Sequence, residues 1–295
     1  MELHDVSKSS SADGLSVLSE EQLHKVQQIS LMMLDDIDSV CRKQGIKYIL
    51  IGGSAIGALR HKGFIPWDDD IDIAMTRRNY VKFAKEFRKA FPEKYTVSDA
   101  GDDNNYGRLI PKVRLTGTTY RTVLEHDLKD CGIRIDIFLI ENTFNNAVLR
   151  WGQGVIAMFF GFALSCRRLY TWRREFKKLY NGMSFKIKKI FGFMFSFASL
   201  HTWARWTDKW NGICKNNRSE YVSVPTDVYH FFGELEKRED ICRRRKVMFE
   251  GREMYIPAEY DPYLKKRYGE YMQLPPEEKR LRSKYLEFDL GKYSE

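Results

Sequence analysis

Three aspartates close together in the sequence form the pattern with the clearest chemistry. Asp70 and Asp72 alternate with Ile71 and Ile73, which predicts a strand with both carboxylates on one face. Asp68 shares that direction if the strand begins early. Carboxylates this close repel one another unless a cation neutralises them. Oxygen ligands of this kind suit Mg²⁺, with Mn²⁺ as the alternative, so the segment predicts a metal site.

A fourth aspartate lies in another strand-like run. In residues 133–138 three isoleucines occupy one face and Asp136 occupies the other. A lone carboxylate among apolar neighbours is costly to bury unless it is paired or bound to a metal. We therefore expect Asp136 to lie near Asp70 and Asp72 and to act with them as a metal ligand.

A pair of glycines precedes the acidic segment. Gly52 and Gly53 come just before an expected short helix, with Ser54 next to them. Glycines let backbone N–H groups approach an anion closely, and a helix N-terminus adds partial positive charge. A glycine pair alone is most often only a turn. Combined with paired aspartates and a distant third, it predicts a site that binds a phosphoryl group and one or two metal ions.

A sheet flanked by helices has to position these residues. Ser19 to Gln22 has the form of a capping box, and the apolar spacing after it predicts an amphipathic helix that ends near Gly45. A second helix is expected around residues 80–87, and strands at 47–51, 71–75, 95–97, 109–115 and 133–139. This order of elements predicts an α+β (mixed α/β) fold with a central mixed sheet.

Composition divides the chain into four segments. We expect a disordered tail at 1–18, the catalytic core at 19–146, a helical basic and aromatic insertion at 147–217, and a C-terminal segment packing on the core at 218–295. The net charge is +9, and residues 147–215 hold about thirteen Lys or Arg against two acidic residues. The positive charge is confined to one segment and no RNA-binding module is evident, so we expect no nucleic-acid partner.

The insertion has two interpretations. Its apolar run at 154–165 is shorter than the roughly twenty residues that span a bilayer. With basic residues on both sides, it fits a helical hairpin lying on an anionic membrane. The alternative is a helical subdomain that buries its aromatic residues and solvates its charges.

The chain gives no sign of export. Its N-terminus is polar and lacks a secretory signal, and its five cysteines are scattered and odd in number, which favours a reducing compartment. We expect a cytoplasmic protein, peripheral at the inner face of the membrane if the hairpin interpretation holds.

Three segments resemble the LicD family of phosphocholine transferases, which includes the fukutin-type proteins. Residues 52–73 resemble the family's signature, and the runs 135–138 (Ile-Asp-Ile-Phe) and 268–276 (Tyr-Gly-Glu-Tyr-Met-Gln-Leu-Pro-Pro) resemble two further segments. The chain departs from the family at Leu139, where a Pro is usual, and around Ser283, where a His is common. The resemblance implies a nucleotidyltransferase-like fold for residues 19–146.

The resemblance also implies a reaction. Phosphocholine, or a related phospho-alditol, would move from a CDP-linked donor such as CDP-choline to a sugar hydroxyl of a surface glycan: lipopolysaccharide, teichoic acid, capsule or a lipid-linked glycan. Asp70, Asp72 and Asp136 fall on the family's metal-binding positions, with Asp68 beside them, and residues 52–54 fall on its donor-phosphate turn. Either Asp68 or Asp136 could take the proton of the attacking hydroxyl.

Three further residues are candidates for donor binding. Lys112 and Arg114 alternate with Val113 on an expected strand and fall where the family commonly has Lys and then Arg. Arg can bind two diphosphate oxygens at once, although one of the two side chains could simply face solvent. Trp67 adjoins the acidic run, and its ring could either hold a trimethylammonium group or pack beneath the loop.

Two other functions share this scaffold. Attack on the proximal phosphorus of an NTP would give nucleotidyl transfer to a small molecule or an RNA end. A non-catalytic, membrane-associated scaffold of the same fold is the other alternative. Loss of an aspartate would mark such a scaffold, and Asp70, Asp72 and Asp136 are all present.

Overall fold

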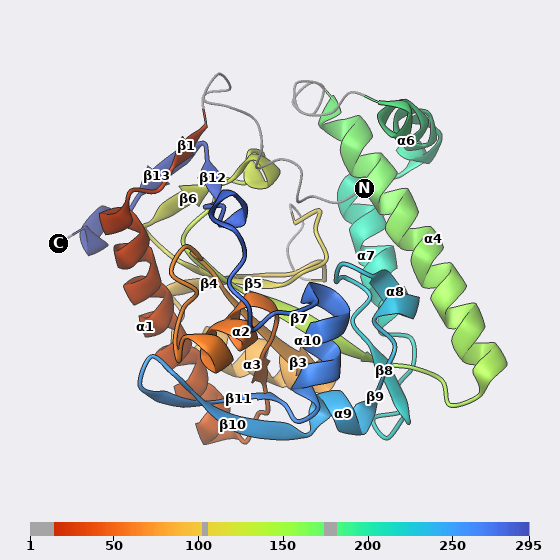
Figure 1. Ribbon diagram of the computed structural model, residues 1–295. Helices are drawn as coiled ribbons and strands as arrows, with labels where there is room; N and C mark the ends of the chain where they lie inside the picture. Colours follow the sequence, from red (N-terminus) through yellow and green to blue (C-terminus); the bar gives the residue numbers. More distant parts are fainter. Residues whose placement is uncertain (1–14, 102–105, 174–181, 295) are drawn as a thin grey trace. The chain divides into compact units, whose positions relative to one another are not determined.

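The computed structural model describes residues 15–101, 106–173 and 182–294 (Figure 1). The chain divides into two compact units, each made of separate stretches of sequence. Unit 1 comprises Met1–Val97, Lys112–Leu139 and Lys237–Glu295, and unit 2 comprises Ser98–Pro111 and Ile140–Glu236. The predicted mixed α+β fold, with a curled central mixed sheet flanked by helices, is confirmed.

The central sheet has the strand order β2-β3-β7-β5-β4. Its strands are β2 (Ile49–Leu50), β3 (Ile71–Thr76), β7 (Arg134–Asn142), β5 (Lys112–Leu115) and β4 (Tyr95–Ser98). β2 pairs with β3 and β5 pairs with β7, both antiparallel, and the second pairing sets Lys112 opposite Asp136. This register brings a cation to the fourth predicted aspartate.

Three helices of unit 1 belong to this core: α1 (Glu20–Gln44), α2 (Gly52–Arg60) and α3 (Arg77–Ala90). α1 begins at the predicted capping box and ends at Gly45, whose left-handed φ of 63° closes the helix. Its apolar stripe is buried as the spacing predicts. α2 begins at Gly52, so the glycine pair, which was expected just before the helix, forms its first turn.

The remaining elements of unit 1 come mostly from the C-terminal segment. They are β1 (Ser16–Val17), β6 (Thr119–Arg121), η3 (Val123–Glu125), α9 (Arg238–Cys242), β10 (Arg244–Phe249), β11 (Arg252–Pro257), α10 (Tyr260–Tyr268), η5 (Glu277–Lys279), β12 (Lys284–Tyr285), β13 (Glu287–Asp289) and η6 (Gly291–Tyr293). β12 pairs with β1 and β13 pairs with β6. Residues 16–17, inside the expected tail, therefore belong to a strand, whereas residues 1–14 lie outside the described part.

Unit 2 contains the helical insertion. Its elements are α4 (Ala147–Thr171), α6 (Met183–Met194), η4 (Phe195–Phe197), α7 (Leu200–Asn211), β8 (Tyr221–Ser223), α8 (His230–Gly233) and β9 (Glu236–Lys237), the last of which ends at the unit boundary. β8 pairs with the end of β7. A small core forms where Ala163 and Leu164 of α4 meet Trp203 and Ala204 of α7.

α4 is longer than its apolar run suggests. It spans 25 residues and contains an 18-residue window with a mean hydropathy of 1.4, and among the described helices it alone has the length and composition to cross a membrane. The sequence-based length limit was therefore wrong for this segment, because the helix continues on both sides of residues 154–165. Core helices of soluble proteins share this length and composition.

Candidate functional site

The glycine turn and the acidic segment lie against each other in unit 1. Ser54 Oγ accepts a hydrogen bond from the Asp72 N–H at 2.9 Å. A Cβ placed on Gly53 would lie 2.7 Å from Asp68 Oδ2, and one on Gly52 would lie 3.4 Å from Asp72 Oδ2. The close approach of backbone to carboxylate explains why glycine occupies both positions.

α1 and β3 fix the acidic loop. Gln27 of α1 donates its side-chain amide to the Asp68 carbonyl at 2.8 Å. The loop then enters β3 at Ile71, so Asp72 lies on a strand whose apolar neighbours Ile71 and Ile73 are fully buried. The predicted alternation of Ile and Asp is confirmed, and it directs Asp72 away from the apolar face.

The pKa values of two carboxylates in this loop, Asp68 and Asp70, are raised. Burial raises the pKa of Asp68 well above its usual range, and the charges of Asp70, Asp69 and Asp72 add to the effect. Burial raises the pKa of Asp70 to about 6, assisted by the charges of Asp69 and Asp136. Asp136 therefore acts electrostatically on the same site as Asp70, although 66 positions separate them in the sequence.

Asp136 has one satisfied and one unsatisfied oxygen. Lys112 Nζ donates to Asp136 Oδ2 across the β5–β7 pair. Asp136 Oδ1 is buried and accepts no hydrogen bond from any described residue; Arg134 Nε lies 3.7 Å away. A buried carboxylate oxygen without a donor is available to ligate a cation.

The donor set fits a hard divalent cation in chemistry. It consists of carboxylate oxygens, whose negative charge Mg²⁺ or Mn²⁺ would neutralise. In the described ranges, no three His, Cys, Asp or Glu side chains lie close enough together to coordinate one metal ion. Binding of a metal by Asp70, Asp72 and Asp136 therefore stays a prediction.

Comparison with known proteins identifies the domain. Residues 45–154 match a family model described as LicD/FKTN/FKRP, nucleotidyltransferase domain. The chain carries a LicD-family nucleotidyltransferase domain. This confirms the resemblance, and the matched LicD-family range contains the glycine turn, the acidic loop, Lys112 and Asp136.

Two curated proteins are similar in sequence to this chain. The lipopolysaccharide cholinephosphotransferase LicD of Haemophilus influenzae (strain KW20 / Rd) is 27% identical over 265 residues, which cover 87% of this chain and 93% of that protein. An uncharacterised protein of Rickettsia prowazekii (strain Madrid E) is 33% identical over 87 residues, or 28% of this chain and 33% of that protein. The first similarity extends beyond the LicD-family domain into both flanking segments.

Lys112 and Arg114 are both buried, so the alternative that one of them faces solvent was wrong. Burial lowers the pKa of Lys112, while its partner Asp136 favours the charged form. Arg114 has no exposed surface, and its Nη2 lies 2.5 Å from Glu125 Oε1. In the LicD-family site Lys112 thus faces the acidic cluster, and donor contact by Arg114 stays a prediction.

Arg134 and Glu125 are site residues that the sequence reasoning missed. Arg134 lies two positions before Asp136 on β7, and its Nη1 is 3.4 Å from Glu125 Oε2. Burial would raise the pKa of Glu125, but the charges of Arg134, Lys112 and Arg114 hold it below its usual range. The spacing of two on a strand was the signal that could have identified Arg134.

Loss of this buried carboxylate should destabilise unit 1. We expect Glu125→Gln to lower the free energy of unfolding by about 3 kcal/mol, because it leaves Arg114 and Arg134 without their shared anion. Urea unfolding measures the change. The matched control is Glu253→Gln, which breaks the exposed Lys246 pair and should cost little. Equal losses in the two variants would contradict the account.

Asp69 ties the acidic loop to distant parts of the chain. Its Oδ2 accepts a hydrogen bond from Tyr120 Oη, and its Oδ1 accepts one from Ser283 Oγ at 2.6 Å. Ser283, noted above as a departure from the family pattern, therefore contacts the residue between Asp68 and Asp70. The neighbours of Asp69 position the loop from its buried side.

The third resembling segment also reaches the site. A Cβ on Gly52 would lie 3.3 Å from Tyr268 Oη. Arg60 of α2 donates to the carbonyls of Tyr271 at 2.6 Å and Gln273 at 2.9 Å, which holds residues 268–276 beside the glycine turn. The segment is therefore part of the wall around the predicted phosphate site.

Trp67 is half-buried beside the acidic loop. The Arg280 guanidinium carbon lies 5.3 Å from its ring centroid, and His61 makes an edge contact at 6.5 Å between ring centroids. The ring thus already contacts a cation of the protein. Contact of Trp67 with a choline head group stays a prediction.

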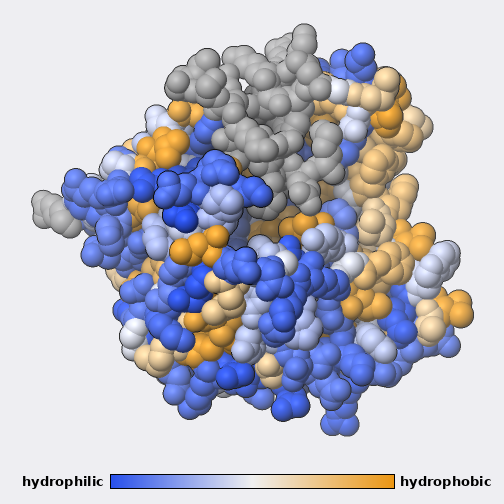
Figure 2. Space-filling model, in the orientation of Figure 1, coloured by the Kyte–Doolittle hydropathy of each residue, from blue (hydrophilic) through white to orange (hydrophobic). Residues whose placement is uncertain are grey.

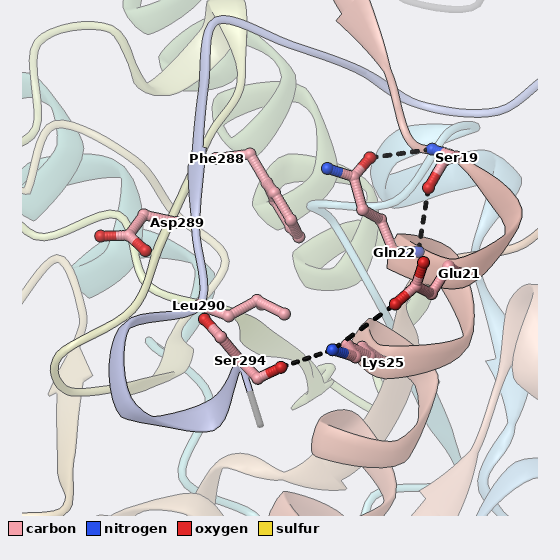
Figure 3. A pocket seen from close by; sticks show the side chains of 8 residues that line it. All are labelled: Ser19, Glu21, Gln22, Lys25, Phe288, Asp289, Leu290 and Ser294. Atoms are coloured by element: carbon pink, nitrogen blue, oxygen red, sulfur yellow. Dashed lines mark hydrogen bonds and ion pairs between the residues drawn. The ribbon is translucent and has the colours of Figure 1, made fainter.

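A separate cavity of about 450 Å³ lies at the start of α1. Figure 3 shows its lining, in which Ser19 and Gln22 bond each other and Lys25 reaches Glu21 and the carbonyl of Ser294. None of the predicted site residues lines it. The polar groups labelled there serve to cap α1 and fasten the C-terminal segment, so we do not assign the reaction to this cavity.

The raised pKa of Asp70 predicts that the stability of the fold depends on pH and on bound metal. Its pKa is about 6 in the folded chain and near 4 in the unfolded chain. The metal-free fold therefore loses stability as pH rises from about 4 to 6, because the folded state binds the extra proton. We expect Asp70→Asn to raise the metal-free melting temperature at pH 7.5 and to leave it nearly unchanged at pH 4.

Thermal unfolding with and without Mg²⁺ measures this effect. Added Mg²⁺ should stabilise the unaltered chain at pH 7.5 and should have a smaller effect on Asp70→Asn. Glu278→Gln, which changes an exposed carboxylate, is the control and should follow the unaltered chain. A lower melting temperature for Asp70→Asn at pH 7.5 would contradict the account.

Proposed function

We propose that this chain transfers phosphocholine from CDP-choline to a sugar hydroxyl of a lipopolysaccharide-type glycan, in a reaction that depends on Mg²⁺. The observation that carries the proposal is the 27% identity across 87% of the chain to the Haemophilus influenzae lipopolysaccharide cholinephosphotransferase. The intact set of aspartates beside a glycine turn supports it, since a non-catalytic scaffold has no use for clustered carboxylates.

The proposed reaction is one in-line displacement. The acceptor hydroxyl oxygen forms a bond to the phosphorus of the phosphocholine group, and the bond from that phosphorus to the oxygen it shares with CMP breaks. CMP leaves with the electron pair. Asp70, Asp72 and Asp136 would hold Mg²⁺, which would supply positive charge to offset the negative charge of the donor diphosphate and of CMP.

The chain's own residues have distinct tasks in this scheme. The backbone N–H groups at Gly52, Gly53 and Ser54, in the first turn of α2, bind the donor phosphates. Lys112 donates to Asp136 and fixes the position of its carboxylate. We assign the proton of the acceptor hydroxyl to Asp68, because Asp136, the other candidate, is already paired with Lys112.

A panel of donors tests which phosphorus–oxygen bond of the donor breaks and which group is transferred. The purified chain with Mg²⁺ and a lipopolysaccharide acceptor is given CDP-choline, CDP-ribitol, CDP-glycerol or an NTP, and CMP and pyrophosphate are measured. The proposal expects CMP from CDP-choline alone. CMP released from CDP-ribitol or CDP-glycerol instead would show that the transferred group is phosphoribitol or phosphoglycerol and not phosphocholine. Pyrophosphate from an NTP would replace the proposal with nucleotidyl transfer.

A further inference from the structure

The helices α4 and α6 of unit 2 each have one side that packs in the core and one side that is exposed to solvent. On α4 the packed stripe includes Gln153, Gly154 and Ala157, and the Gln153 amide donates to the Asn142 carbonyl at 3.0 Å. The opposite stripe follows a spacing of three and four and is exposed to solvent: Val148, Trp151, Val155, Met158 and Phe162. Half of the helix therefore builds the core of unit 2 and the other half does not.

α6 likewise has one exposed apolar side and one packed side. Its exposed stripe is Met183, Ile187, Ile190 and Met194, and Phe197 of η4 continues it. Ile190 is 62% exposed and Phe197 is 72% exposed. On the packed side, a Cβ on Gly192 would lie 2.3 Å from the Cys166 carbonyl of α4, so this glycine lets the two helices approach closely.

Ring contacts join the two stripes into one surface. Phe162 of α4 meets Phe191 of α6 at 5.5 Å between ring centroids, and Phe159 meets Phe195 at 6.1 Å. Phe197 extends the contacts to Trp206 of α7 at 6.5 Å. We call the exposed apolar residues of α4, α6, η4 and α7 the outer face; in Figure 2 hydrophobic side chains run along the right-hand edge, where α4 lies in Figure 1.

The helices that carry the outer face are rich in basic residues. The described residues between 147 and 211 include nine Lys or Arg and a single acidic residue, Asp208. On α6, Lys186 and Lys189 are exposed and each precedes a residue of the apolar stripe by one position. Lysines placed beside an apolar stripe can extend their charged heads toward anionic headgroups while the stripe enters the acyl boundary.

We propose that the outer face binds the surface of an anionic lipid membrane, with α4 and α6 lying in the interface. An exposed apolar surface of this extent marks an interaction site. The excess of Lys and Arg, with Lys186 and Lys189 exposed beside the α6 stripe, selects a partner that presents both apolar and negative groups, which describes an anionic lipid leaflet. The exposed Trp151 and Trp206 suit the headgroup level, where Trp is enriched.

Two other occupants fit the surface less well. A second copy bound through this face would bring the same lysines against each other, because a twofold interface repeats one patch on both sides. A membrane-spanning α4 would expose its packed side to lipid, including Gln153 and the Gln153 carbonyl that accepts from Trp210 Nε1 at 3.0 Å. Interfacial binding keeps the core of unit 2 intact.

This inference goes beyond the proposed transfer reaction. Binding to lipid depends on unit 2 residues, whereas the proposed chemistry depends on Asp68, Asp70, Asp72 and Asp136 of unit 1. An acceptor glycan that is anchored in lipid would be presented at the same membrane surface.

Flotation of the full chain with lipid vesicles tests the proposal. One set contains phosphatidylcholine alone, and the other contains equimolar phosphatidylcholine and phosphatidylglycerol. We expect binding to the anionic set that weakens as salt rises. Ile190→Ser with Phe197→Ser should reduce partitioning by at least about tenfold, and Lys186→Gln with Lys189→Gln by about tenfold on the anionic set.

Matched controls separate surface binding from misfolding and from catalysis. Val81→Ser with Met248→Ser removes two exposed apolar residues of unit 1 and should leave binding unchanged. Asp72→Asn should also bind vesicles as the unaltered chain does. Several results would overturn the proposal: no binding to anionic vesicles, equal loss in the Val81 control, resistance to alkaline extraction, or a dimer that Ile190→Ser with Phe197→Ser converts to monomers.

Discussion

Replacing Asp72 with asparagine is expected to lower the rate of phosphocholine transfer by at least about a thousandfold. Asp72 is fixed by a hydrogen bond from its N–H to Ser54 Oγ, and its Oδ2 lies beside Gly52 at the turn proposed to bind the donor phosphates. Asparagine keeps the size and the backbone contacts but removes the negative charge that a divalent cation requires. The loss should therefore appear in kcat, with little change in the melting temperature.

Steady-state CMP release at saturating Mg²⁺ measures this loss. Glu278→Gln is the control, because it removes an exposed carboxylate of η5 outside the site. Raising Mg²⁺ or replacing it with Mn²⁺ should restore little activity to Asp72→Asn. If the variant kept a tenth or more of the activity, Asp72 would have no part in metal binding.

Adding one methyl group at Gly53 should lower transfer by about a hundredfold. The Cβ of Gly53→Ala would lie 2.7 Å from Asp68 Oδ2, so the carboxylate proposed to take the acceptor proton has to move. Alanine inside a helix ordinarily stabilises it by about 1 kcal/mol relative to glycine. We therefore expect activity to fall while the fold remains stable.

Gly152→Ala provides the comparison for Gly53→Ala. Gly152 is also helical, but a Cβ there meets no atom within 4 Å, so activity should be unchanged. Transfer rate and thermal unfolding are measured for both variants. Full activity of Gly53→Ala would show that the glycine turn and Asp68 do not act together.

Local patterns in the sequence predicted the elements on which the candidate site residues lie. The capping box at Ser19 located α1, and the alternation of Ile and Asp located β3. The isolated Asp136 among isoleucines located a strand that lies at the site. These predictions succeeded because each depends on spacing within one element.

Contacts between distant segments could not be predicted in the same way. Tyr120 and Ser283 bond to Asp69 from 51 and 214 positions away, and no local pattern links them. The pairing of Lys112 with Asp136 depends on strand register, which emerges only when β5 lies beside β7. The full length of α4 was missed because polar and basic residues at its ends interrupt the apolar run without ending the helix.

The most direct test of the account follows the phosphocholine group itself. CDP-choline labelled in its choline methyl groups is incubated with the full chain, Mg²⁺ and lipopolysaccharide, and the label is measured on the glycan. The account predicts label on the glycan, in equal amount to the CMP released, and its loss in Asp72→Asn. Label that remains in CDP-choline, or that reaches the glycan equally with Asp72→Asn, would contradict it.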